Sequence, residues 1–144
     1  MKAEYMPQRQ TKRSCGYDIH AEKDIVLTKG VWQIVNTGVK FDGTERIMDT
    51  KKWFGLIVPR SSFGFKYKLR FANTVCIIDQ DYRDDIMIQM IADEDLVIKK
   101  GERFAQMIFM PYLTLMDEVS PVAERVGGLG STTRQVRFES HNRM

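Results

Sequence analysis

The sequence predicts an all-β protein, either a barrel or a sandwich of short strands. Its apolar residues come in short bursts rich in β-branched and aromatic side chains, and Gly, Pro, Asn, Asp or Lys bounds each burst. No window of about twelve residues has the apolar spacing of an amphipathic helix. Several short strands at roughly even spacing are typical of all-β barrels and sandwiches.

The individual elements follow from the same pattern. The expected strands, in chain order, are 25–27, 31–35, 54–58, 75–78, 86–91, 96–98 and 104–110. The run 86–91 is almost unbroken, which predicts a strand buried on both faces. One short helix is expected over 61–68, directly after Pro59 and Arg60. The polar stretch 42–52 is expected to be a loop.

The length of 144 residues suits one folded domain with a tail. We expect the β-barrel domain to span 1–120. From Pro121 onward the chain holds glycines, hydroxyl residues and arginines, with little that could enter the domain's own core. The segment 121–144 is therefore interpreted as a mobile tail that orders on a ligand or on a neighbouring chain.

Composition excludes several classes of protein. A hydrophobic fraction of 43% is typical of a folded globular chain rather than a disordered one. No apolar run approaches the roughly 18 residues of a membrane span, and the polar, basic start argues against a secretory signal. Two cysteines and two histidines are too few for a disulfide framework or a structural zinc site. We expect a cytoplasmic protein, in the host-cell cytoplasm if it is viral, with free thiols.

The net charge of +3 is compatible with either of two classes of anionic partner, a nucleic acid or a phosphorylated small molecule. Direct nucleic-acid binding is disfavoured, because no basic stripe interleaves with aromatic residues.

Two segments contain the residue types that bind phosphate. The segment 124–134 combines hydroxyls and arginines with glycines, which let backbone N–H groups turn toward an anion. It is not a P-loop, and by itself it also fits an unspecific glycine-rich tail. In the segment 59–66, Arg60, Ser61 and Ser62 begin a helical turn, where free N–H groups form an anion site. That pattern equally fits a helix capped by Ser61 or Ser62.

Carboxylates in two other segments are candidates for chemistry. Asp79 directly follows strand 75–78, before a tight acidic turn, and a carboxylate at such a rim can polarise a water as a general base. The alternative is an ordinary hairpin, since Asp and Asn favour turns. Asp18, within 16–21, could face a metal-bound water or be a turn residue. The segment 101–106 by itself predicts only a turn that leads into a strand.

Taken together and in this order, five segments resemble the motifs of the trimeric deoxyuridine triphosphatases (dUTPases). The segments are Gly16-Tyr17-Asp18, Pro59-Arg60-Ser61-Ser62, Asn73 to Tyr82, Gly101 to Gln106 and Arg125 to Thr132. The resemblance covers almost the whole chain. It implies a β jelly roll, a distorted barrel of the β-clip type, assembled as a homotrimer whose active sites combine motifs from different chains.

The resemblance also implies the reaction. A water attacks the α-phosphorus of dUTP with the help of Mg²⁺ and gives dUMP and pyrophosphate, which limits uracil incorporation into DNA and supplies dUMP for dTMP synthesis. Asp79 is implied as the base that orients and deprotonates this water. Asp18 is implied to hold the water shell of the metal.

Substrate-binding roles are implied for the remaining motif residues. Asn73, with the backbone of Ile77 and Ile78, reads the uracil edge. Tyr82 packs against the deoxyribose and leaves no room for a 2′-hydroxyl, and Met87 lies near the sugar and base. Arg60, Ser61, Ser62 and Gly64 are implied to bind the phosphate chain, and Gln106 to support a nearby water or phosphate. From the tail, Arg125, Ser131 and Thr132 are implied to close over the terminal phosphates, and Leu129 and Gly130 are further implied substrate-binding residues.

The chain departs from the family pattern at several positions. Leu129 stands where an aromatic residue usually stacks on the uracil, which predicts binding weaker by about 1–3 kcal/mol. Cys76 and Thr133 stand where glycine is frequent. The loop before the second motif, which contains Lys51, is unusually long and charged. These departures predict a divergent, slower enzyme.

Two alternatives are considered. A dCTP deaminase has a related fold, but it needs a glutamate in the strand after the acidic turn, and 86–90 contains none. A regulatory protein, whose nucleotide-bound state controls a protein partner, would suit the 42–52 loop and the altered tail. The retained Asp79, Tyr82 and Arg60 favour the enzyme, although both activities can coexist.

Overall fold

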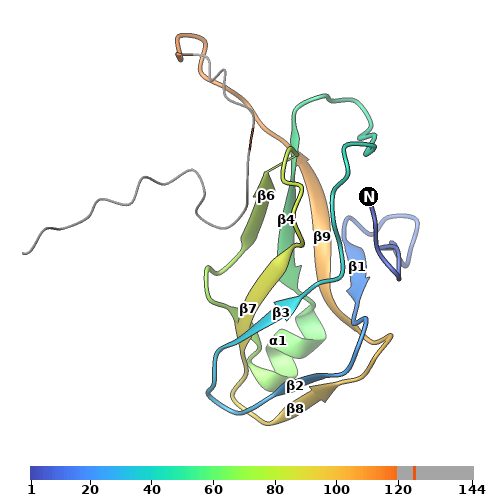
Figure 1. The fold of residues 1–144 in the computed structure, drawn as a ribbon, viewed down its shortest axis with the longest axis vertical. Coiled ribbons are helices and arrows are strands. Elements are labelled where there is room, and N and C mark those ends of the chain that lie inside the picture. Colours follow the sequence, from blue (N-terminus) through green and yellow to red (C-terminus); the bar gives the residue numbers. More distant parts are fainter. Residues whose placement is uncertain (120–124, 126–144) are drawn as a thin grey trace, which may run out of the picture.

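The computed structural model describes residues 1–119 and Arg125, and this part of the chain forms three small β-sheets and one short helix (Figure 1). The prediction of an all-β protein is confirmed. The elements are β1 (Tyr17–His20), β2 (Ile25–Leu27), β3 (Gln33–Asn36), β4 (Trp53–Pro59), α1 (Ser61–Tyr67), β5 (Arg70–Phe71), β6 (Cys76–Asp79), β7 (Met87–Ile91), β8 (Leu96–Ile98) and β9 (Arg103–Pro111).

The largest sheet has the strand order β1-β9-β4-β6, and all its pairs are antiparallel. Strands β2 and β8 form a second sheet, and β3, β7 and β5 form a third. The long strand β9 pairs with β1 on one side and with β4 on the other, so that Gln106 lies between Asp18 and Val58. Residues far apart in the sequence therefore meet at one end of this sheet.

The core follows from the two-residue period of the strands. Trp53, Gly55 and Ile57 of β4 point inward, and Phe104 and Met107 of β9 are fully buried. Aromatic rings fill the space behind them. Phe41 and Trp53 pack edge-on, with their ring centroids 5.2 Å apart.

Several predicted elements need correction. Strand 86–91 was expected to be buried on both faces, yet Gln89 is exposed while Ile88 and Met90 are buried. Among the described residues of one chain, no second layer covers Gln89 on the outer face of β7. Strand β1 was not predicted, because its short apolar pattern forms a strand only by pairing with β9. Helix α1 agrees with prediction and ends where Lys68 adopts a left-handed φ of 54°.

The acidic turn joins two strands that lie in different sheets. β6 pairs with β4, whereas β7 pairs with β3 and β5, so an ordinary hairpin of β6 and β7 is wrong. The side chain of Gln80 accepts a hydrogen bond from the Trp53 N–H at 3.0 Å and holds the turn against β4. The 42–52 segment is an irregular loop, as predicted. Within residues 1–119 and 125, no helix is long and apolar enough to cross a membrane.

Candidate active site

A polar pocket of about 440 Å³ lies where β1, β9 and the end of β4 meet. It brings together four residues that the sequence predicted for the site, namely Asp18, Arg60, Ser61 and Gln106. We call it the arginine pocket. The described residues that line it are Gln10, Arg13, Ser14, Cys15, Gly16, Asp18, Arg60, Ser61, Arg103 and Gln106.

Asp18 is the electrostatic centre of the arginine pocket. Its side chain is buried in strand β1, and each carboxylate oxygen faces one guanidinium. Oδ1 lies 3.4 Å from Nε of Arg60, and Oδ2 accepts a hydrogen bond from Nη1 of Arg103 at 3.1 Å. Two guanidinium groups against one carboxylate leave a net positive charge, which suits an anionic ligand.

The start of helix α1 differs from the predicted cap. Arg60 is the N-cap residue, with an extended backbone and no side-chain cap, so capping by Ser61 or Ser62 is wrong. Both serines lie in the first helical turn with exposed side chains. The Arg60 carbonyl accepts hydrogen bonds from the N–H groups of Phe63 and Gly64. The backbone donors that the helix itself does not use therefore belong to Ser61 and Ser62, whereas that of Gly64 is engaged.

Gln106 is held by close packing. Its Nε2 donates to the Pro59 carbonyl at 3.4 Å. A Cβ atom at position 16 would lie only 2.2 Å from Oε1 of Gln106, so Gly16 lets this side chain lie against β1. Sequence reasoning gave no role to Gly16 or Arg103. The sequence feature that could have indicated a role for Arg103 is its position at the start of a strand, directly after a glycine turn.

The second group of predicted residues surrounds the acidic turn at the end of β6. Asp79 is the last residue of that strand, and its side chain is mostly exposed. Arg125 donates from Nη2 to Oδ2 of Asp79 at 2.6 Å and from Nε to Oδ1 of Asp81 at 2.9 Å. Its guanidinium also lies 5.9 Å from the ring centroid of Tyr82. The resemblance implied that the tail reaches another chain, whereas Arg125 here contacts the acidic turn of its own chain.

Two residues beside the acidic turn, Arg125 and Tyr82, have raised pKa values. Hydrogen bonding to Asp81, together with the nearby charge of Asp79, raises the pKa of Arg125. Burial raises the pKa of Tyr82, and the negative charge of Asp84 adds to this effect. The phenol therefore stays protonated, and it donates to the Asp85 carbonyl at 3.3 Å.

Asn73 lies in the turn between β5 and β6. Its side chain is exposed, and its Oδ1 lies 3.6 Å from the thiol of Cys76. Burial raises the pKa of this thiol. β6 is an edge strand of its sheet among the described residues, so that the backbone of Ile77 or Ile78 has polar groups directed away from β4.

The two groups of residues lie at opposite ends of one sheet. In the pairing of β4 with β6, Asp79 lies opposite Phe54, whereas Arg60 follows Pro59 at the far end of β4. Phe54 and Pro59 are five residues apart (59 − 54), which corresponds to about 17 Å along a strand. In one chain, the arginine pocket and the acidic turn therefore cannot contact neighbouring phosphate groups.

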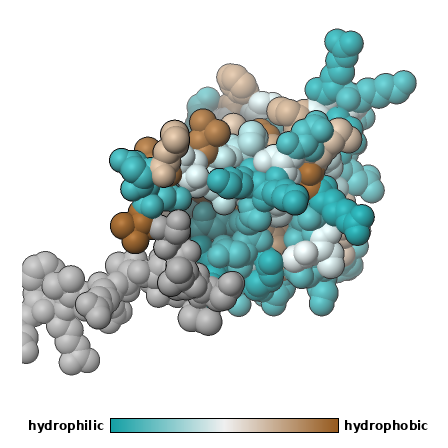
Figure 2. All heavy atoms as spheres, turned by 90° about the horizontal axis from the view of Figure 1, so that it is seen from above, coloured by the Kyte–Doolittle hydropathy of each residue, from teal (hydrophilic) through white to brown (hydrophobic). Residues whose placement is uncertain are grey.

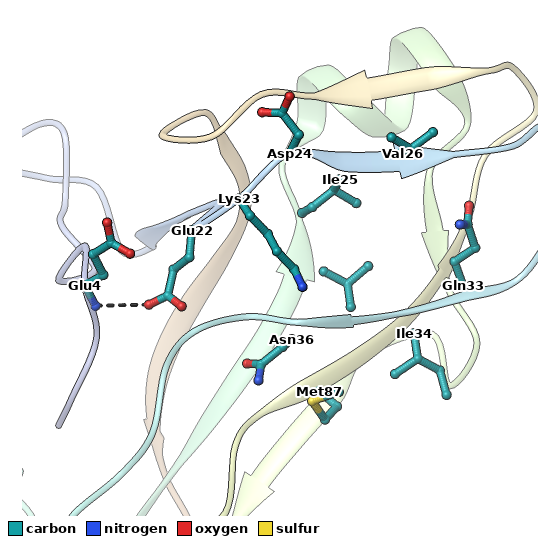
Figure 3. A pocket seen from close by; sticks show the side chains of 11 residues that line it. Glu4, Glu22, Lys23, Asp24, Ile25, Val26, Gln33, Ile34, Asn36 and Met87 are labelled. Carbon is teal, nitrogen blue, oxygen red and sulfur yellow. Dashed lines mark hydrogen bonds between the residues drawn. The ribbon is translucent and has the colours of Figure 1, made fainter.

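Met87 lies with neither group. It lines a separate cavity of about 560 Å³ between the N-terminal segment, β2 and β3, where Figure 3 shows it next to Asn36. Among the described residues, Met87 is the one predicted substrate-binding residue that lines this cavity. The predicted tail residues Leu129, Gly130, Ser131 and Thr132 lie outside the described residues.

Comparisons with known proteins agree on one family. The sequence model of the dUTPase family matches residues 2–133. The deoxyuridine 5′-triphosphate nucleotidohydrolase of Nautilia profundicola is 33% identical over 136 residues, which cover 88% of this chain and 89% of the relative. That of Lactococcus lactis subsp. lactis is 36% identical over 136 residues, which cover 88% and 87%.

Solved structures give the same result. The dUTPase from Streptococcus mutans has a TM-score of 0.62 and 30% identity, and the match covers 76% of this chain and 87% of that chain. The dUTPase of Staphylococcus bacteriophage 80alpha has a TM-score of 0.63 at 23% identity, covering 85% and 92%, which supports the fold alone. The chain belongs to the dUTPase family, and the predicted dUTPase-like fold is confirmed.

Proposed function

We propose how this chain carries out dUTP hydrolysis, the reaction for which its family is named. A water oriented by Asp79 attacks the α-phosphorus, and the arginine pocket of a second copy holds the phosphate chain, so that dUMP and pyrophosphate form. The observation that carries the proposal is the convergence of Asp18, Arg60 and Gln106, from three separate motifs, in one cationic pocket. Such a pocket stabilises the negative charge of a polyphosphate.

A second copy is required because one chain cannot complete the site. Asp79 must reach the α-phosphorus, and only one bridging oxygen separates that atom from the next phosphorus. The arginine pocket, however, begins about 17 Å from Asp79 along β4, which is too far to hold a neighbouring phosphate. We propose a homotrimer in which the acidic turn of one copy faces the arginine pocket of the next. The opposite net charges of the two regions support this pairing.

The segment after β9 supports assembly as well. Leu113, Met116 and Val119 are almost fully exposed, and they follow the long strand without packing on the described core. Seen from that end, apolar side chains lie on the outer rim of the molecule (Figure 2). Exposed apolar groups of this kind are stabilised when another chain covers them. We propose that residues 112–119 pack on a neighbouring copy.

The edge strand β6 supplies the recognition of uracil in this proposal. One of Ile77 and Ile78 directs both its N–H and its C=O away from β4, and a donor beside an acceptor matches the edge of uracil. Cytosine reverses that pattern and would leave buried polar groups unpaired. The Asn73 amide adds to this contact. The deoxyribose packs on the face of Tyr82 that Arg125 now covers, with Met87 nearby in the assembled trimer.

Mg²⁺ is the proposed cofactor, and Asp18 is the residue that would face it. Among residues 1–119 and 125, no three His, Cys, Asp or Glu side chains are grouped to hold a metal by themselves. Asp18 fits a role through water, because each of its oxygens has one guanidinium partner and a further lone pair. When bound, the ion neutralises phosphate charge. Arg60 and Arg103 hold the carboxylate in place.

Arg125 has two positions in the proposed cycle. Without substrate it engages Asp79 and Asp81. With substrate it moves to the phosphates, because a triphosphate offers it more negative charge than two exposed carboxylates do. Its departure frees Asp79 to accept the proton of the attacking water. The glycine-rich tail then closes over the site and excludes bulk water.

A substrate panel tests the proposed function. Purified chain is incubated with Mg²⁺ and, separately, with dUTP, dTTP, dCTP or UTP, and the pyrophosphate and ammonia released are measured. We expect pyrophosphate from dUTP in preference to the other three. Ammonia from dCTP would instead identify a deaminase, and equal hydrolysis of all four nucleotides would contradict the proposed recognition of uracil and deoxyribose.

A further inference from the structure

A second groove lies beside the arginine pocket, between the N-terminal segment and the 42–52 loop. Its volume is about 700 Å³. Figure 1 shows the two segments side by side, and the terminal amine of Met1 forms ion pairs with Asp42 and Glu45. We call it the methionine groove. The lining residues that carry the argument are Met6, Arg9, Tyr17, Arg46, Met48 and Phe109.

Apolar side chains make up a large part of the lining of the methionine groove. Two of them, Tyr17 of β1 and Phe109 of β9, pack edge to face, with ring centroids 5.5 Å apart. Met48 is 84% exposed and Met6 is about half exposed. Methionines are flexible, polarisable side chains that adapt to different partners. An open, adaptable apolar surface of this kind suits the side chain of another protein better than it suits solvent.

The rim of the groove carries uncompensated positive charge. Within the described part of the chain, Arg9 donates only to the backbone carbonyls of Lys12 and Ser14, and it lies over the ring of Tyr17. Arg46 has no ion pair among the described residues. Glu45 is the one acid among the described lining residues, and it already binds the amine of Met1 and two backbone N–H groups. The groove therefore favours a negatively charged partner.

We propose that the methionine groove binds an acidic segment of another protein. An apolar side chain of the partner inserts between Tyr17 and Met48, and its carboxylates pair with Arg9 and Arg46. Ser14 and Cys15 line both this groove and the arginine pocket, so the bound segment lies beside the site of the substrate's phosphates. The groove thus gives the chain a binding function beyond dUTP hydrolysis.

Fluorescence anisotropy with the full chain tests the proposal. The probes are short labelled peptides that place one Leu or Trp among Asp and Glu residues, and the matched peptides carry Ala or Lys instead. The variant Arg46→Glu is compared with Lys51→Glu, which makes the same charge change at an exposed position of the same loop outside the groove lining. We expect roughly tenfold weaker binding for Arg46→Glu and little change for Lys51→Glu.

Three outcomes would overturn the proposal. The acidic, apolar peptides could show no binding, or both variants could weaken binding equally, which would indicate unspecific charge attraction. Alternatively, Arg46→Glu could change the sedimentation of the chain, which would show that the groove is an interface between copies. Hydrolysis of dUTP is measured on the same preparations, and we expect it to be unchanged. Unaltered chain that binds the acidic peptides but does not hydrolyse dUTP would count against the proposed function and not against the groove.

Discussion

The arginine pocket and the acidic turn have opposite arrangements of charged side chains. In the pocket, two guanidinium groups hold one buried carboxylate, Asp18, whose strand β1 pairs with the long strand β9. In the turn, two exposed carboxylates share the single guanidinium of Arg125 at the edge of the sheet. The first region is positive around a buried carboxylate, and the second is exposed and negative.

This difference in charge and exposure indicates which part of the proposed reaction each region serves. A preformed positive pocket suits the proposed binding of a phosphate chain, because its side chains are already held by each other. An exposed carboxylate with a replaceable partner can accept a proton from water. Since one chain keeps the two regions about 17 Å apart, the complementary charges are best satisfied between copies.

The largest expected effect comes from Asp79→Asn. We expect the rate of dUTP hydrolysis to fall by about 10²–10⁴-fold, because the amide cannot accept the proton of the attacking water. Binding of dUTP, measured by calorimetry, should persist. The matched control is Asp81→Asn, which removes the other carboxylate that Arg125 contacts. Near-normal turnover of Asp79→Asn would show that the turn does not supply the base.

Mixing two inactive variants tests whether the regions act across copies. Chains with Asp79→Asn and chains with Arg60→Ala are unfolded and refolded together in equal amounts. If each site takes Asp79 from one copy and Arg60 from another, about a quarter of the sites contain an intact Asp79 and an intact Arg60, since the two kinds of chain combine at random. The mixture should regain that share of wild-type activity. No recovery would mean that one chain supplies both residues to a site.

Removing one guanidinium from the arginine pocket should have a moderate effect. Arg103→Ala leaves the buried Asp18 with one partner instead of two. We expect the free energy of unfolding to fall by about 1–3 kcal/mol, together with weaker pyrophosphate binding. Urea titration and calorimetry measure the two effects. Arg103→Lys retains the charge and should recover part of each, whereas wild-type values for Arg103→Ala would contradict the role of this ion pair.

The smallest expected effect concerns the two thiols, one in each region. Burial raises the pKa of Cys76 above its ordinary value of 9.0, whereas Cys15 is exposed at the arginine pocket. The unfolded chain therefore loses the Cys76 proton at lower pH than the folded chain does. The stability that depends on the protonated, buried thiol is fully present below pH 9.0 and decreases as the pH rises above that value.

Alkylation measures this difference directly. With iodoacetamide between about pH 7 and pH 9, we expect Cys15 to react well before Cys76, because the thiolate is the reactive form and must be accessible. Peptide mass spectrometry gives the two rates. Equal rates would show that the acidic-turn side of the sheet opens readily in solution.

Much of the fold could be predicted because its signals are local. The strands 25–27 and 96–98 agree with β2 and β8, since short apolar runs bounded by turn residues form strands in many contexts. Strand β1 could not be predicted in this way, because it depends on pairing with β9. The same holds for β6 and β7, whose separation into different sheets is a property of distant partners.

The sequence by itself determined the residue types of the site, because motif resemblance identifies Asp18, Arg60 and Gln106 without any knowledge of their distances. Only the tertiary structure decided that Arg103 completes the pocket and that Asp79 lies at the opposite end of the sheet. The physical reason is strand register. It sets which side chains of distant segments become neighbours, and it arises from the packing of the whole domain rather than from local propensity.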